Sequence, residues 1–198
     1  MSTTQSTEAA SAPILQAPYF DRVRDRTSPR VNHQIDRRTA DTLERLAASD
    51  PAAIVGRLVE LDPGLAENAR RGLADLGITG VEVITGDAGD LGVYAPAAPA
   101  DLVLECGVFG NISDADVERT VRASPALCAP GATLLWTRNR RAPDLTDAIR
   151  AWFIESGFAE IAFEPVPDSL ASVGVARFLG ETAALTDQLL FTFNRTRL

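Results

Sequence analysis

The sequence has no lysine, only one histidine, only two cysteines and no long apolar run. Cys106 and Cys128 are too few for a disulfide framework and lack the paired spacing of a zinc site, so we expect core or near-site thiols and no metal centre. No run approaches the roughly 20 apolar residues of a membrane-spanning helix, which argues against a membrane partner. The N-terminus has neither the basic nor the apolar part of a signal peptide, and we therefore expect a cytoplasmic protein.

A surplus of positive charge is also missing. The net charge is −8 and the pI is about 4.7, whereas nonspecific nucleic-acid binding needs basic residues to displace counterions from phosphate, so we expect no nucleic-acid partner. All 19 basic residues are arginines, and two groups are candidates for binding an anion: Arg22, Arg24, Arg26, Arg30, Arg37 and Arg38, and then Arg138, Arg140 and Arg141. The alternative is ion pairing with Asp21, Asp25 and Asp36 for the first group, and an exposed basic loop for the second.

Short apolar runs alternate with helical patterns from residue 57 onward. This alternation is typical of crossover helices on a parallel sheet, and it predicts an α/β fold with a doubly wound, mostly parallel sheet. We expect the last strand to be antiparallel, at the sheet edge. The predicted strands are 57–61, 81–84, 100–104, 132–136, 158–163 and 173–178, and the predicted helices are 63–77, one that begins after Ser113, and 144–156.

The first 56 residues depart from this pattern. We expect a disordered tail at 1–14 and a single domain at 15–198, in which the segment 15–56 is atypical. A helix is predicted at 39–48. Residues 30–36, where a first buried strand is expected, are mostly polar.

Five ordered segments carry a resemblance to a known family. They are LVELDP (58–63), TGDAGDL (85–91), ADLVLECGVFGNI (100–112), LCAPGATLLWTR (127–138) and ESGFAEIAF (155–163). In order and spacing they resemble the class I S-adenosylmethionine-dependent methyltransferases. The resemblance implies a Rossmann-like fold whose ligands bind at the carboxyl ends of the strands.

The family's most specific motif, a glycine-rich loop after the first strand, is absent. All 14 glycines lie at Gly56 or later, so no alignment places such a loop before Glu60. Its expected position holds Ile35 to Thr39, whose side chains fill the space in which glycines allow close approach of the cofactor. The sequence therefore predicts a disabled S-adenosylmethionine site and favours no cofactor.

The resemblance also assigns roles for the case in which the cofactor is retained. It implies Glu60 on the ribose hydroxyls, Asp87 and the Ala88 backbone on adenine, and contacts from Cys106 and Val108 in the following loop. The candidate catalytic residues are Asn111, Asp114 and Arg138, and the candidates for holding a substrate anion are Arg37, Arg38, Arg140, Arg141 and His33. Each has a structural alternative, such as a core position for Cys106, a surface or capping position for His33, or the first turn of a helix for Asp114.

Three functions fit these observations. The favoured one is a repurposed, cofactor-independent biosynthetic enzyme that acts on a small anionic natural-product intermediate by substitution, cyclisation or elimination, with aziridine-type ring closure as an example. The resemblance suggests it, because the family has such members in actinobacterial pathways. The alternatives are an S-adenosylmethionine-dependent methyltransferase of a small molecule, and a noncatalytic subunit of a biosynthetic complex that binds a protein partner through its N-terminal segment.

Overall fold

The computed structural model describes residues 48, 50–166 and 168–193. The chain divides into two compact units, Met1–Arg30 and Val31–Leu198, and every described residue belongs to the second. The predicted tail, the polar segment 30–36 and nearly all of the predicted helix 39–48 lie outside the described residues, as do His33, Arg37 and Arg38. The described elements are η1 (Pro51–Ala53), β1 (Val55–Glu60), α3 (Pro63–Asp75), β2 (Gly80–Thr85), η2 (Leu91–Tyr94), β3 (Ala100–Glu105), α4 (Asp114–Ala123), η3 (Ser124–Ala126), β4 (Cys128–Asn139), α5 (Thr146–Glu155), β5 (Phe158–Pro165) and β6 (Ala171–Phe178).

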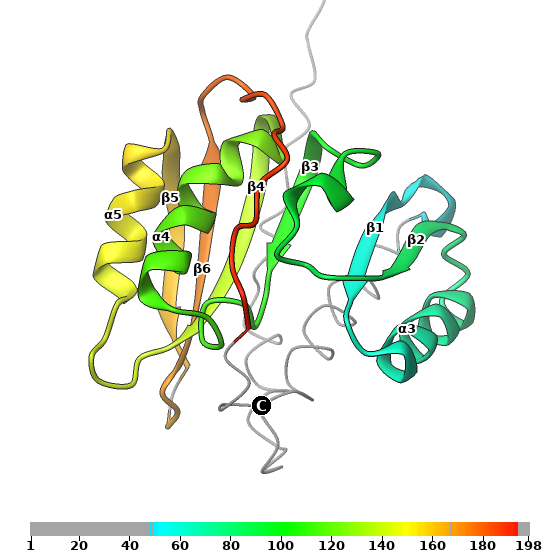
Figure 1. Ribbon diagram of the computed structural model, residues 1–198, viewed down its shortest axis with the longest axis horizontal. Coiled ribbons are helices and arrows are strands. Elements are labelled where there is room, and N and C mark those ends of the chain that lie inside the picture. Colours follow the sequence, from blue (N-terminus) through cyan, green and yellow to red (C-terminus); the bar gives the residue numbers. More distant parts are fainter. Residues whose placement is uncertain (1–47, 49, 167, 194–198) are drawn as a thin grey trace, which may run out of the picture. The chain divides into compact units, whose positions relative to one another are not determined.

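β1 and β2 form a two-stranded parallel sheet and are connected by α3 (Figure 1). The helix begins at Pro63, whose fixed φ suits a first helical residue, and the Asp62 side chain caps it by accepting a hydrogen bond from the Leu65 N–H. It ends just before Gly77, which has a φ of +72°. Its buried side chains pack against the sheet in a small apolar cluster of Ala66, Leu73, Ile78 and Val83.

The other four strands form one mixed sheet in the order β3-β4-β6-β5. β3 is parallel to β4, and β6 is antiparallel to both β4 and β5, so the predicted α/β fold and the antiparallel last strand are confirmed. The predicted position of that strand at the edge is wrong, because β5 is the edge strand and β6 lies inside. The crossover through α5 leaves a position open beside β4, and the tight β5–β6 hairpin brings β6 into it.

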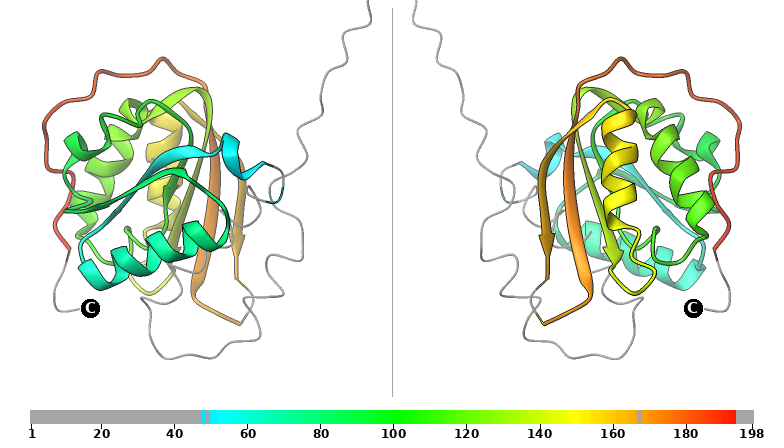
Figure 2. Two further views of the ribbon diagram at one scale, coloured as in Figure 1. Left: turned by 90° about the vertical axis from the view of Figure 1, so that its right-hand side faces the viewer. Right: turned by 90° about the vertical axis from the view of Figure 1, so that its left-hand side faces the viewer.

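The main core lies between this sheet and two helices. α4 and α5 pack side by side on one face of the four-stranded sheet (Figures 1 and 2). Val117 and Val121 of α4 and Ile149 and Phe153 of α5 are buried there, and the Trp136 ring of β4 stacks on Phe153 with ring centroids 6.0 Å apart. The core thus fixes β4, whose carboxyl end carries several candidate site residues.

The C-terminal segment returns to the loop that follows β2 (Figure 2). The Leu190 N–H donates to the Gly89 carbonyl at 2.7 Å, and both Leu190 and Phe191 are buried. A Cβ atom on Gly89 would lie 2.2 Å from the Phe191 carbonyl oxygen, so this close approach requires glycine. The C-terminal segment is therefore built into the connection between β2 and β3.

Two element boundaries differ from the sequence predictions in ways that matter for the site. β3 continues to Glu105, so the strand ends on a buried acidic residue. β4 begins at Cys128, and the predicted proline-glycine turn at Pro130 and Gly131 lies within it, where its pairing with β3 shifts register. None of the helices in the described part of the chain is long and apolar enough to cross a membrane.

Candidate functional site

Two carboxylates lie at the carboxyl ends of the neighbouring strands β1 and β2. Glu60 is the last residue of β1, and Asp87 follows β2 by two residues. The backbone joins the two loops directly, because the Gly86 N–H donates to the Glu60 carbonyl at 3.0 Å. The parallel pairing, which matches Glu60 with Thr85, thus brings two of the sequence-predicted cofactor residues to one edge.

Among the residues that the structure describes, each of these carboxylates accepts a hydrogen bond through only one of its two oxygens. Glu60 is half-buried, and its Oε1 accepts a hydrogen bond from the Asp62 N–H at 2.9 Å. Asp87 is exposed, and its Oδ1 accepts from the Gly89 N–H at 2.8 Å. Within the described residues, Oε2 of Glu60 and Oδ2 of Asp87 have no hydrogen bond. The turns therefore hold both side chains in place while leaving acceptors for hydroxyl or amine donors.

The loop after β3 is a closed turn. Gly107 has a φ of +73°, and its N–H donates to the Thr137 hydroxyl on β4 at 2.8 Å. The Asn111 side chain is buried and donates from Nδ2 to the Gly107 carbonyl at 2.7 Å. Cys106 is buried at the start of this turn and Val108 is half-buried within it. Asn111, a predicted catalytic residue, thus positions the turn through its amide.

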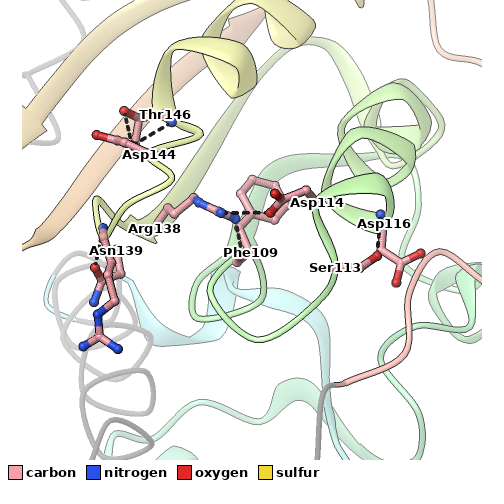
Figure 3. Close-up of polar contacts among 9 residues, drawn as sticks. Phe109, Ser113, Asp114, Asp116, Arg138, Asn139, Asp144 and Thr146 are labelled. Carbon is pink, nitrogen blue, oxygen red and sulfur yellow. Dashed lines mark hydrogen bonds and ion pairs between the residues drawn. The ribbon is translucent and has the colours of Figure 1, made fainter. Parts of the chain in front are cut away.

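Arg138, near the end of β4, holds this loop in place through two contacts (Figure 3). Its Nη1 donates to the Phe109 carbonyl, and its Nη2 contacts Asp114 Oδ1 at 3.1 Å. The Arg138 side chain is 9% exposed, whereas that of Asp114 is 54% exposed. Asp114 is the first residue of α4, which Ser113 caps, so the helix-terminus alternative holds for its position. The structure brings Arg138, Asp114 and Asn111 together around one loop.

The three arginines at the carboxyl end of β4 and just after it, Arg138, Arg140 and Arg141, do not gather around one point. Arg140 donates from Nη2 to the Ser169 carbonyl at 2.9 Å, on the side of the sheet toward β6, whereas Arg138 leans toward α4. Arg141 is exposed. Among the described residues, the buried Nε atoms of Arg138 and Arg140 have no hydrogen-bond partner. An anion site shared by all three arginines therefore has no support from the geometry.

Glu105 is a buried ionisable residue that the sequence did not identify as a candidate site residue. It is 6% exposed, its Oε1 accepts a hydrogen bond from the Ser124 hydroxyl at 2.9 Å, and its Oε2 has no partner in the described part of the chain. Burial raises the pKa of the Glu105 carboxyl to about 7. Burial also raises the pKa of Tyr94 and that of Cys128, with a smaller contribution from the charge of Glu105. The available signal was an acid directly after the apolar run Leu102 to Leu104.

No family model matches the chain, and no curated protein matches it in sequence. Solved structures are similar to it in fold. An O-methyltransferase family protein from Burkholderia thailandensis matches with a TM-score of 0.58 and 16% identity, over 82% of this chain and 56% of that one. The pyocyanin biosynthetic protein PhzM matches with a TM-score of 0.51 and 16% identity, over 69% of this chain and 46% of that one. The chain thus spans about half the length of these two proteins.

These similarities show that the chain has the Rossmann-like fold of the class I S-adenosylmethionine-dependent methyltransferases, as the sequence resemblance predicts. They contradict the expectation that no cofactor is used, because the proteins that share the fold point to S-adenosylmethionine. The glycine-rich loop is missing, but the acceptors at the strand ends, Glu60 and Asp87, are present. Within the described residues, no group of three or more His, Cys, Asp or Glu side chains is arranged to hold a metal ion.

Proposed function

We propose that the protein binds S-adenosylmethionine and transfers its methyl group to a small molecule. The observation that carries the proposal is the pair of acceptors at one strand edge, Glu60 and Asp87. Each is fixed by a backbone hydrogen bond through one oxygen, and its other oxygen has no partner among the described residues. The fold similarity to an O-methyltransferase family protein supports the same reaction class. This reading replaces the cofactor-independent cyclisation that the sequence favoured.

The described residues fit the adenosine part of this cofactor. Glu60 Oε2 would accept from the ribose hydroxyls, and Asp87 Oδ2 would accept from the exocyclic amine of adenine. The backbone of Ala88, whose carbonyl already accepts from the Tyr94 hydroxyl at 3.1 Å, would lie along the ring edge. When bound, the cofactor supplies a methyl group on a positively charged sulfur, which an electron-rich atom of the substrate attacks.

The loop after β3 would meet the substrate. Cys106, which is buried, and Val108, which is half-buried, would give the substrate an apolar surface, and Asn111 holds the turn of this loop closed. Arg138 fixes one oxygen of Asp114, and the exposed remainder of that carboxylate is the acceptor for a proton released by the substrate. In this arrangement Arg138 and Asn111 are positioning residues, and Asp114 is the group that exchanges the proton.

Titration calorimetry of the full chain with S-adenosylmethionine tests the proposal. We expect binding in the micromolar range. Glu60→Gln keeps an oxygen for the Asp62 N–H but loses the charge, and hydrogen bonds to charged groups contribute about 1.5–3 kcal/mol, so the affinity should fall about 10- to 100-fold. Glu67→Gln, on the exposed side of α3, is the matched control and should bind like the unaltered protein.

The outcomes separate the remaining readings. Absence of binding at millimolar cofactor would overturn the methyltransferase proposal. If the protein binds S-adenosylmethionine but methylates no small acceptor, and if it also associates tightly with another protein, a noncatalytic subunit would be favoured. Equal affinities for Glu60→Gln and the unaltered protein would show that the cofactor lies elsewhere.

A further inference from the structure

The C-terminal segment, described over residues 180–193, runs beside α4 to the connection between β2 and β3 without forming a helix (Figure 1). Near its start the Thr182 hydroxyl donates to the Cys128 carbonyl at 2.7 Å. Further along, Leu190 and Phe191 are buried in the main core. The backbone groups of an extended segment need partners on other elements, so these contacts decide where the segment lies.

Two backbone hydrogen bonds join this segment to the connection after β2. The Leu190 N–H donates to the Gly89 carbonyl at 2.7 Å. In the opposite direction, the Leu91 N–H donates to the Gln188 carbonyl at 3.1 Å. Together they form a short antiparallel pairing, which fixes the end of the turn that follows β2.

The same glycine also holds the Asp87 carboxylate. The Gly89 N–H donates to Asp87 Oδ1 at 2.8 Å, while the Gly89 carbonyl accepts from Leu190. The start of the turn is fixed separately, because the Gly86 N–H donates to the Glu60 carbonyl. The turn that carries Asp87 is thus attached to β1 at its start and to the C-terminal segment at its end.

Arg119 of α4 holds the C-terminal segment at the residue that reaches this turn. Its Nη1 donates to the Leu190 carbonyl at 3.0 Å, so Leu190 is fixed through its carbonyl as well as through its N–H. An ion pair with Asp116, three residues earlier on the helix, fixes the direction of the guanidinium. Three consecutive hydrogen bonds therefore lead from α4 through Leu190 and Gly89 to the Asp87 carboxylate.

We propose that Arg119 is a positioning residue for Asp87 and that it sets the preference of the site for adenine. The proposal rests on the proposed function, in which Asp87 Oδ2 accepts from the exocyclic amine of adenine. Because Oδ1 is bound to the Gly89 N–H, the direction of Oδ2 follows the backbone of Gly89, which Leu190 and Arg119 hold. Without the Arg119 donor the turn takes more orientations, and the contact with the amine weakens.

Arg122, three residues further along α4, provides a matched comparison. Its side chain is 45% exposed, against 48% for that of Arg119, and it also pairs with an acidic residue of the same helix, Glu118. Among the described residues, the Arg122 side chain donates hydrogen bonds to Glu118 and Glu155 and to no part of the C-terminal segment. The two arginines therefore differ chiefly in the bond to Leu190.

Hydrogen exchange of the full chain without ligand tests whether Arg119 holds the segment. Arg119→Met keeps the helix propensity and the apolar part of the side chain but removes the donor. We expect the N–H groups of Leu91 and Leu190 to exchange about three- to tenfold faster, as for the loss of one partly exposed hydrogen bond from a charged group. Exchange in β4 and β6 should not change. Unchanged exchange at Leu91 and Leu190 would overturn the proposal.

Three further variants show which contact of Arg119 matters. Arg119→Lys keeps a charged donor and should recover part of the protection. Asp116→Asn removes the ion pair but leaves the bond to Leu190, so it should preserve most of the protection, and Arg122→Met should preserve all of it. A loss in Arg122→Met as large as that in Arg119→Met would mean that any arginine of α4 acts in this way, and it would overturn the specific role.

Two ligands test the link to adenine. S-adenosylhomocysteine carries the exocyclic amine, whereas S-inosylhomocysteine has a carbonyl oxygen in its place and offers Asp87 no amine. In titration calorimetry, Arg119→Met should bind S-adenosylhomocysteine about three- to tenfold more weakly than the unaltered protein does, and S-inosylhomocysteine no more than about twofold more weakly. Arg122→Met should bind both like the unaltered protein. An equal loss for both ligands in Arg119→Met would show a general effect on the structure and would overturn the positioning role.

The unaltered protein separates this proposal from the proposed function. If it binds both ligands with equal affinity, Asp87 does not contact the amine, so the positioning role is overturned while the proposed function stands. If it binds neither ligand, the two proposals fail together.

Discussion

Glu105 shows what one buried acid does to this fold. Its carboxyl has one hydrogen bond, from Ser124, and one buried oxygen without a partner, and its burial raises the pKa to about 7. Because this folded-state pKa lies above the ordinary value of 4.5, the native state binds more protons than the unfolded chain between those two pH values. The stability from the neutral form is complete below about pH 4.5 and is lost as the pH rises toward 7.

We therefore predict that Glu105→Gln flattens the pH dependence of stability. The unaltered protein should lose about 3 kcal/mol from this group between pH 4.5 and 8, since one unit of pKa shift corresponds to about 1.4 kcal/mol. Glutamine keeps an acceptor for the Ser124 hydroxyl and has no charge to bury. Urea unfolding at pH 5, 6, 7 and 8 measures the effect, and Glu181→Gln, at an exposed position, is the control. Parallel pH curves for Glu105→Gln and the unaltered protein would contradict the prediction.

At the scale of elements, the contact between the C-terminal segment and the β2–β3 connection depends on one glycine. Gly89→Ala would place a methyl group against the Phe191 carbonyl. We expect the segment around Leu190 to detach and the free energy of unfolding to fall by about 1–3 kcal/mol, the usual cost of overpacking.

Gly72→Ala, in α3, is the control: nothing lies within 4 Å of its added Cβ, so it should stabilise the helix by about 0.5–1 kcal/mol. Urea unfolding and proteolysis of the C-terminus check both variants, and an intact C-terminus in Gly89→Ala would refute the contact's dependence on glycine.

The sequence predicted elements better than contacts. Local signals, such as Asp62-Pro63 before α3 and Gly157 after α5, placed the helices to within a few residues, because caps and turns are decided by neighbouring residues. The order of strands is not local, and so β6 was expected at the edge. The hydrogen bond from Arg138 to the Phe109 carbonyl could not be predicted from the sequence, because the acceptor is a backbone group 29 residues away and any residue type provides one.

The whole described unit has two separate apolar clusters rather than one. The smaller cluster, around Leu73, lies under β1 and β2, and the larger, around Ile149, lies under the four-stranded sheet. A small cluster buries little apolar surface, so its strands should open at lower free energy than the rest.

We predict that the two clusters respond separately to core mutations. Leu73→Ala and Ile149→Ala each remove a buried side chain at a cost of about 2–5 kcal/mol. Hydrogen exchange should quicken at least tenfold in β1 and β2 for the first variant, with little change in β4 and β6. The second variant should quicken exchange in β4 and β6. Uniform acceleration across all strands in both variants would mean that the unit unfolds as a single cooperative block.

The hydrogen bond from Leu190 to Gly89 also bears on synthesis. The ribosome makes the loop after β2 long before it makes the residues that cover that loop. Before the residues around Leu190 are made, β1, α3 and β2 can form, but Gly89 and Leu91 lack their backbone partners in that segment. The edge that carries Asp87 is therefore completed only after the residues around Leu190 have been made.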